Sequence, residues 1–111
     1  LSAFLKRLGM HYDVCSDGLE AIKQFEQHAE RYDIILMDCE MPHCDGFEAT
    51  RAIRQYEAKT ERKTTPVIAL TAHHSAEMIE RCRQATMDQH LSKPLDFDQL
   101  KTTLAQFLLS G

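Results

Sequence analysis

The sequence predicts an α/β domain in which a parallel sheet is covered by helices on both faces. The hydrophobic pattern changes several times along the chain between the 3.6-residue period of amphipathic helices and short continuous apolar runs. The run from Ile34 to Met37 is apolar on both of its faces, as a central strand of a parallel sheet requires. With 111 residues the chain is long enough for one packed core. We therefore expect residues 1–111 to form a single domain.

Each element follows from this alternation. Apolar residues that share one helical face between Leu1 and Leu8 predict a first helix, which should end at Gly9. Ser75 and Asp96 are expected to cap later helices, because their side chains can accept backbone N–H groups. The run 89–92 is the weakest strand and is expected at an edge of the sheet. The complete prediction places strands at 11–16, 33–37, 67–70 and 89–92, and further helices at about 19–29, 47–56, 75–84 and 97–108.

Composition excludes several classes of function. The net charge is -4 and the pI about 5.8, so direct nucleic-acid binding is not expected. No apolar run approaches the length of a membrane span, and we expect no direct membrane contact. The four cysteines form no CxxC pair and are predicted to be reduced thiols. A cytoplasmic location is therefore expected.

Three polar residues stand where three predicted strands end. Asp38 follows the strand at 33–37, Thr71 follows the strand at 67–70, and Lys93 follows the strand at 89–92. Because the carboxyl ends of parallel strands share one edge of the sheet, these side chains should meet in one crevice. A carboxylate, a hydroxyl and an ammonium together can form a phosphoryl-transfer site. The alternative is that Asp38 and Lys93 form only an ion pair, while Thr71 satisfies a strand end.

The motifs around these three residues indicate a known family. The pattern D-x-x-M-P-x-x-D-G is formed by Asp38, Met41, Pro42, Asp45 and Gly46; "LTA" spans Leu70 to Ala72, and Lys93 precedes Pro94. With these motifs in this order, the whole chain resembles the receiver domain of two-component response regulators. It looks most like the receivers of hybrid sensor histidine kinases.

The resemblance implies a flavodoxin-like sheet with strand order 2-1-3-4-5 and a phosphorylation site. By analogy, Asp38 accepts a phosphoryl group from a phosphohistidine, and the phosphate is bound by Thr71, Lys93 and Ala72. The Lys93–Pro94 peptide bond would be cis. Mg²⁺ would be bound by the Asp38 carboxylate and the backbone carbonyl of Glu40, offsetting the repulsion between two anions. Glu40 and His73 occupy positions that influence the lifetime of the acyl phosphate in this family.

The partner implied by the resemblance is a histidine kinase or a histidine phosphotransfer domain. The domain itself would catalyse only its own phosphorylation and dephosphorylation, within a hybrid histidine kinase, as the cytoplasmic part of a membrane-bound sensor kinase. Thr71 and His90 would form the switch that reports phosphorylation.

The sequence departs from the family pattern in three ways. Receivers begin with a strand that carries an acidic pair for Mg²⁺, and this chain starts after it; Asp13 and Asp17 cannot replace that pair. We expect that strand to belong between the strands at 11–16 and 33–37, so that residues 1–111 are an N-terminally incomplete domain. His90 stands where the family usually has Tyr or Phe, and imidazole is titratable near neutral pH. Thr86 replaces a glycine, which is expected to strain the turn.

Two other functions remain open from sequence alone. These departures are compatible with a degenerate receiver that binds its partner without phosphorylation. A phosphatase of the aspartyl-phosphate type is a more distant alternative, because that family needs a second Asp where this chain has Glu40.

Overall fold

The computed structural model describes residues 1–40, 45–73 and 75–109. The elements, in chain order, are helices α1 (Ser2–Arg7) and α2 (Gly18–His28), 3-10 helix η1 (Ala29–Arg31), strand β1 (Ile35–Asp38), helix α3 (Gly46–Lys59), strand β2 (Val67–Thr71), helix α4 (Ala76–Gln84), strand β3 (Gln89–Ser92) and helix α5 (Phe97–Leu109).

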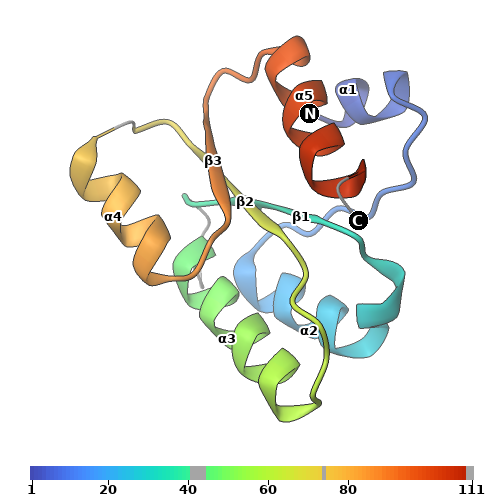
Figure 1. Cartoon of the computed structure of the whole chain (residues 1–111), viewed down its shortest axis with the longest axis vertical. Coiled ribbons are helices and arrows are strands. Elements are labelled where there is room, and N and C mark those ends of the chain that lie inside the picture. The colour runs from blue at the N-terminus through green and yellow to red at the C-terminus, as the bar shows by residue number, and fades with distance from the viewer. Residues whose placement is uncertain (41–44, 74, 110–111) are drawn as a thin grey trace.

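The sheet of the described residues has three parallel strands in the order β1-β2-β3 (Figure 1). All five residues of the central strand β2 are buried, whereas β1 is buried only at Met37. The predicted edge position of residues 89–92 is confirmed by β3. The run at 33–37 was predicted to be central, but β1 lies at the other edge of this sheet because its only strand partner among the described residues is β2.

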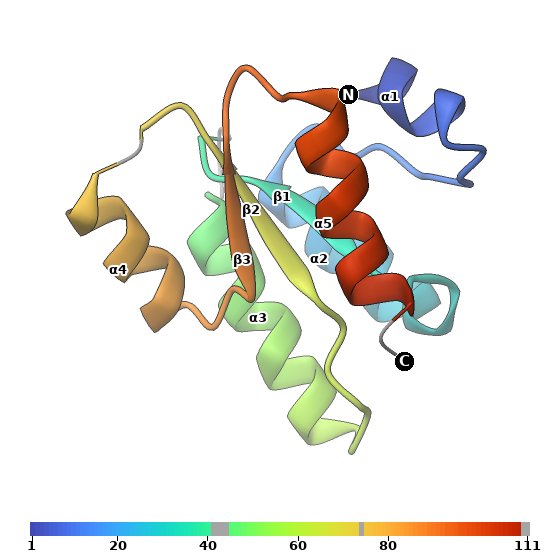
Figure 2. The ribbon, with the colours of Figure 1, turned by 45° about the horizontal axis from the view of Figure 1, so that its top comes forward.

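Side chains of β2 alternate between two cores, one on each face of the sheet. Val67 and Ala69 belong to a core with residues of α2, α3 and α4, whereas Ile68 and Leu70 belong to a core with residues of α1 and α5. Figures 1 and 2 show the same division, with α1 and α5 together on one side of the strands and α2 and α3 on the other. Helices therefore cover both faces, as predicted.

The predicted strand at 11–16 is wrong, because these residues form no strand. A parallel strand needs a neighbour for its backbone hydrogen bonds, and no described strand pairs with this segment. Instead, a cavity of about 420 Å³ is lined both by residues 10–15 and by β1. The segment is held by a side chain, since the Tyr32 hydroxyl donates to the Asp13 carboxylate at 2.6 Å.

Helix boundaries agree with the capping residues in the sequence. The predicted caps Ser75 and Asp96 accept the backbone N–H of Met78 at 3.1 Å and of Gln99 at 2.9 Å, respectively. Gly9 follows α1 with a φ of +71°, the left-handed conformation that glycine adopts readily. The helix predicted at about 47–56 is longer than expected, because α3 continues to Lys59.

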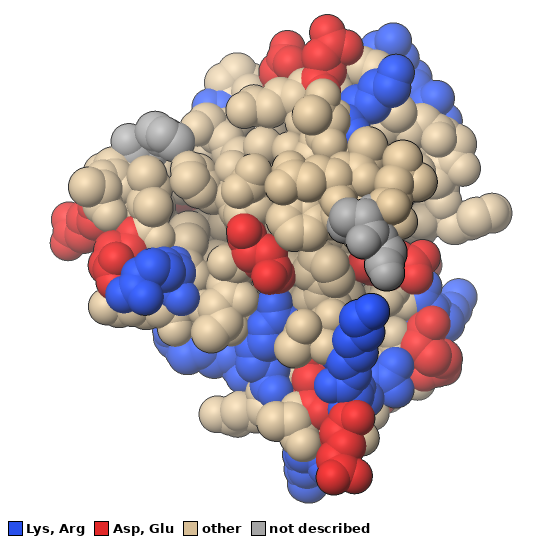
Figure 3. Space-filling model, in the orientation of Figure 1, with Lys and Arg blue, Asp and Glu red and all other residues tan. Residues whose placement is uncertain are grey.

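Charged side chains form no stripe of a single sign on the face that Figure 3 shows. On the face in Figure 3 acidic and basic residues are interspersed among uncharged ones. No helix in the described part of the chain combines the length and the apolarity that crossing a membrane would need.

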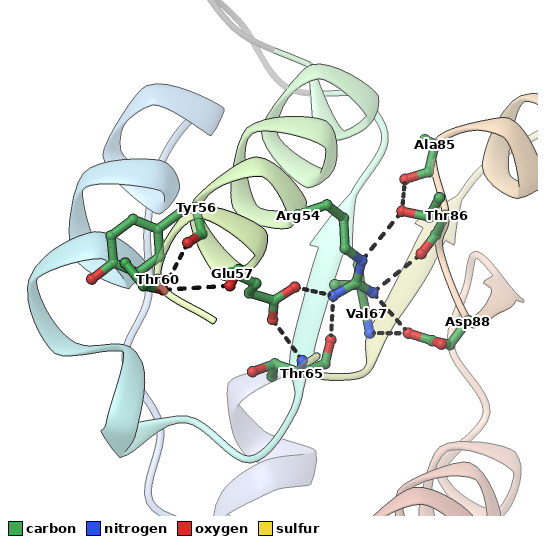
Figure 4. Close-up of polar contacts among 9 residues, drawn as sticks. All are labelled: Arg54, Tyr56, Glu57, Thr60, Thr65, Val67, Ala85, Thr86 and Asp88. Atoms are coloured by element: carbon green, nitrogen blue, oxygen red, sulfur yellow. Dashed lines mark hydrogen bonds and ion pairs between the residues drawn. The ribbon is translucent and has the colours of Figure 1, made fainter. Parts of the chain in front are cut away.

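Arg54 joins three segments at the amino-terminal end of the strands (Figure 4). Its guanidinium donates to the carboxylate of Glu57 at 2.8 Å and to the backbone carbonyl of Thr65 at 2.8 Å, just before β2. It also donates to the carbonyl of Thr86 at 3.1 Å and to the carboxylate of Asp88 at 3.0 Å, in the turn before β3. This network therefore connects α3 with the starts of two strands.

Thr86 adopts the strained backbone that the sequence predicts. Its φ is +65°, in the left-handed region where a side chain is unfavourable and glycine is not. The hydroxyl of Thr86 accepts a hydrogen bond from Arg54 Nε at 3.2 Å, which a glycine could not do. The contact with Arg54 offsets part of the strain in this turn.

Replacing Glu57 by alanine is expected to destabilise the domain by about 1.5–3 kcal/mol, because the change removes the charged acceptor of hydrogen bonds from Arg54 and Thr65. Glu57 is 1% exposed, and its second oxygen accepts the backbone N–H of Thr65 at 2.6 Å. The free energy of unfolding from urea denaturation measures the loss. Glu26→Ala, at an exposed position of α2, is the control and should change stability by less than about 0.5 kcal/mol. Equal effects of the two substitutions would contradict a stabilising role for the network.

Candidate functional site

Asp38, Thr71 and Lys93 meet at the carboxyl-terminal end of the sheet. Asp38 is the last residue of β1, Thr71 is the last residue of β2, and Lys93 follows β3. The backbone N–H of Lys93 donates to the carbonyl of Thr71 at 2.8 Å, which continues the β2–β3 ladder by one residue. The Lys93 ammonium donates to the Asp38 carboxylate at 2.8 Å. Parallel strands thus bring together three residues that are distant in sequence.

Burial differs among these three side chains. Thr71 is 1% exposed, whereas the side chains of Asp38 and Lys93 are 38% and 35% exposed. The Thr71 side chain is therefore packed in the core, whereas the Asp38 carboxylate and the Lys93 ammonium are partly exposed to solvent. The hydrogen bond to Asp38 raises the pKa of Lys93 above its usual value; burial acts in the opposite direction, and the charge of Asp38 and the contact with Glu40 add smaller increases. Lys93 is accordingly a cation at neutral pH.

Glu40 adds a second carboxylate to the site. Its backbone N–H donates to Asp38 Oδ1 at 2.9 Å, where the chain bends after β1. Its side chain accepts from the Thr71 hydroxyl at 3.1 Å and lies 3.4 Å from the Lys93 ammonium. The sequence predicted a backbone carbonyl ligand at Glu40 and a position that influences the lifetime of the acyl phosphate, but these side-chain contacts were not anticipated. The only sequence feature that pointed to these contacts was the position of Glu40, two residues after Asp38.

The remaining predicted residues lie around this centre. Ala72 is exposed directly after β2, and the backbone N–H of His73 donates to the Thr71 hydroxyl at 3.0 Å. His90 is half-buried on β3, opposite Ala69 of β2. The Lys93–Pro94 peptide bond is cis. Met41 and Pro42 of the motif lie outside the described residues.

Asp45 and Gly46 bring α3 close to Asp38. The Asp45 carboxylate accepts the backbone N–H of Glu48 at 2.9 Å and so caps α3. A Cβ atom on Gly46 would lie 2.5 Å from the backbone oxygen of Asp38, closer than such atoms approach in proteins. Glycine at this position therefore permits the helix to start directly against the end of β1.

Cys39 follows Asp38 in the sequence, but its thiol is unreactive. It is buried in the same core as Cys82. Burial, followed by the charge of neighbouring groups, raises the pKa of Cys39 to about 12. The thiol therefore stays protonated at neutral pH and is a poor nucleophile.

The described oxygens are suited to a hard cation. The Asp38 carboxylate and the backbone carbonyl of Glu40 are the ligand types that Mg²⁺ prefers, and this ion commonly needs only one or two protein carboxylates beside water and phosphate. Within residues 1–40, 45–73 and 75–109 there is no cluster of three or more His, Cys, Asp or Glu side chains that could hold a metal. The chain can thus supply part of a Mg²⁺ site.

Similar sequences are found among histidine kinases. The chain is 34% identical over 134 aligned residues to probable histidine kinase 1 of Oryza sativa subsp. indica, covering 96% of this chain and 14% of that protein. It is 38% identical over 102 residues to hybrid signal transduction histidine kinase B of Dictyostelium discoideum, covering 85% of this chain and 5% of that protein. The chain therefore spans only a small part of these relatives.

A solved structure with the same fold agrees with this relationship. The receiver domain of a sensor histidine kinase from Pseudomonas aeruginosa is 38% identical and superimposes with a TM-score of 0.83, covering 96% of this chain and 84% of that one. That crystal structure has a magnesium ion coordinated in its active-site cleft. The family described as the response regulator receiver domain matches residues 1–105. The chain belongs to this family and has its α/β receiver fold.

Proposed function

We propose that this receiver domain accepts a phosphoryl group from a phosphohistidine onto Asp38 and thereby passes a signal along a phosphorelay. The observation that carries the proposal is the contact of 2.8 Å between the Asp38 carboxylate and the Lys93 ammonium, with Thr71 beside them at the same edge of the sheet. A structural ion pair alone would not need the buried hydroxyl of Thr71.

In the proposed reaction a carboxylate oxygen of Asp38 attacks phosphorus. The bond between phosphorus and the imidazole nitrogen breaks, its electron pair stays on that nitrogen, and an acyl phosphate forms on Asp38. The Lys93 ammonium balances the negative charge on the transferred group, and the Thr71 hydroxyl donates a hydrogen bond to one of its oxygens. Ala72, next to Thr71, supplies a further backbone N–H at the same edge of the sheet.

The proposed cofactor is Mg²⁺, bound in part by the Asp38 carboxylate and the Glu40 backbone carbonyl. When bound, it offsets the repulsion between the carboxylate and the incoming phosphoryl group. Its remaining protein ligands would be an acidic pair on a further strand. Asp38 is 38% exposed, so a cation and a phosphoryl donor can both approach it from solvent.

The proposed partner is a histidine kinase, a histidine phosphotransfer domain, or both. This proposal is supported by the histidine kinases among the relatives, in which the matched region is one small part of a long chain. A cytoplasmic location for the domain would give it access to such a partner.

Phosphorylation of the intact protein by acetyl phosphate tests the proposal. In the presence of Mg²⁺ the intact mass should increase by the mass of one phosphoryl group. Without Mg²⁺ we expect no such increase. A protein that stays unmodified but still binds its histidine kinase would instead indicate an interaction module that works without phosphorylation.

Thr71 and His90 are the proposed switch, in which movement of the Thr71 hydroxyl toward the phosphate allows residue 90 to turn inward. Histidine fills less of the resulting space than tyrosine, so the His90→Tyr variant should couple phosphorylation to partner binding more strongly. The measurement is the ratio of partner affinities with and without beryllofluoride, which mimics a phosphoryl group on Asp38. We expect this ratio to rise about fivefold or more, corresponding to coupling of about 1 kcal/mol. An unchanged ratio would remove His90 from the switch.

A further inference from the structure

The carboxylate of Glu40 contacts both of the groups proposed to bind the phosphate. Glu40 Oε1 accepts from the Thr71 hydroxyl at 3.1 Å, and Glu40 Oε2 lies 3.4 Å from the Lys93 ammonium. The two oxygens thus bridge the end of β2 and the residue after β3. An oxygen of a phosphoryl group on Asp38 would need the same hydroxyl proton and the same cation.

A hydroxyl has only one proton to donate, so its acceptors exclude one another. The Thr71 hydroxyl has a second acceptor within reach, the backbone carbonyl of His73 at 3.0 Å. A charged acceptor forms the stronger hydrogen bond, which favours Glu40 over this neutral carbonyl. Thr71 can therefore serve Glu40 or a phosphoryl oxygen, and not both together.

The contacts of Lys93 are unequal. The distance of 2.8 Å to Asp38 is shorter than the 3.4 Å to Glu40, so the Asp38 contact is the stronger. The Glu40 side chain is 35% exposed and can rotate into solvent without disturbing the core. Glu40 is thus the group that can leave the site at low cost.

We propose that Glu40 is a built-in competitor that occupies the phosphate-binding groups of the unphosphorylated domain and is displaced when Asp38 is phosphorylated. This inference rests on the proposed role of Asp38 as phosphoacceptor. The phosphoryl group brings a charge of about -1.5 to -2 close to the Glu40 carboxylate. Repulsion between the two anions and competition for Thr71 both drive Glu40 outward, so residue 40 sets how readily the domain is loaded.

The test is beryllofluoride binding to the intact protein at fixed Mg²⁺ concentration. Glu40→Gln removes the charge and keeps a neutral acceptor, whereas Glu40→Ala removes both. Glu77→Gln is the matched control, because it removes the same charge from an exposed residue in the first turn of α4. Thermal melting of every variant without beryllofluoride reports whether the fold is retained.

We expect Glu40→Gln to bind beryllofluoride about two- to fivefold more tightly than the wild type, the range that a partly exposed charge contact provides. Glu40→Ala should bind at least as tightly, and Glu77→Gln should match the wild type. Unchanged or weaker binding by both Glu40 variants would overturn the inference while leaving the role of Asp38 intact. If the wild type and Asp38→Asn both fail to bind beryllofluoride, the proposed function fails and the competitor role falls with it.

Discussion

Replacing Asp38 by asparagine is expected to abolish phosphorylation by acetyl phosphate, measured as the increase in intact mass. The amide has the shape of the carboxylate but lacks the anionic oxygen that attacks phosphorus. The Lys93 contact at 2.8 Å can persist to the amide oxygen, so the site should keep its overall arrangement. We expect no mass increase at any time at which the wild type is measurably modified.

Asp45→Asn is the matched control for this experiment. Asp45 is the nearest other aspartate in the motif, and asparagine caps a helix as well as aspartate does, so α3 should remain intact. Acetyl phosphate should therefore increase the intact mass of this variant as it does that of the wild type. Equal labelling of Asp38→Asn and the wild type would show that the acceptor is a different residue.

A large increase in thermal stability is expected from a further strand next to β1. We propose that a fourth parallel strand fills the cavity of about 420 Å³ between residues 10–15 and β1, which is the central position that the receiver fold requires. The strand would pair with the free edge of β1 and convert residues 11–16 into a strand. Each buried backbone group that gains a partner avoids a cost of about 1–3 kcal/mol. Several such groups amount to much of a domain stability of roughly 5–15 kcal/mol.

Thermal melting followed by circular dichroism can measure this effect. A chain extended upstream by the strand should melt cooperatively at a temperature at least about 10 °C above that of residues 1–111, since each 1 kcal/mol shifts the midpoint by about 4–8 °C in a domain of this size. A version with a proline in the middle of the added strand is the control, because proline removes a ladder hydrogen bond. Equal midpoints for all three proteins would show that the cavity is not a strand position.

The sequence was sufficient for the parts of the fold that depend on local pattern. The predicted caps Ser75 and Asp96 accept the hydrogen bonds expected of them, because capping involves residues three positions apart. The meeting of Asp38 with Lys93 was also predictable, since parallel strands place their carboxyl ends at one edge. The segment 11–16 was mispredicted because strand formation depends on a neighbour that its own residues do not specify.

Contacts between side chains of different segments were not predictable in this way. Glu40 reaches Thr71 across 31 residues, and Arg54 reaches Asp88 across 34. Neither pair has a local periodicity, and each depends on how β1, β2 and α3 are placed by the core. Thr86 is intermediate, because its positive φ could be expected from the family's glycine, whereas its contact with Arg54 could not.

The Arg54 network lies at the opposite end of the strands from Asp38, and this separation has a consequence for engineering the protein. In the proposed mechanism the charged, partly exposed groups at the end that carries Asp38 change partners, so added rigidity there would oppose that function. The other end contains a polar network around the buried Glu57, in which Arg54 and Asp88 are partly exposed, and changes there are expected to alter the free energy of unfolding without touching Asp38, Thr71 or Lys93. Variants of greater thermal resistance that keep their chemistry should therefore be sought around Arg54, Glu57 and Thr86.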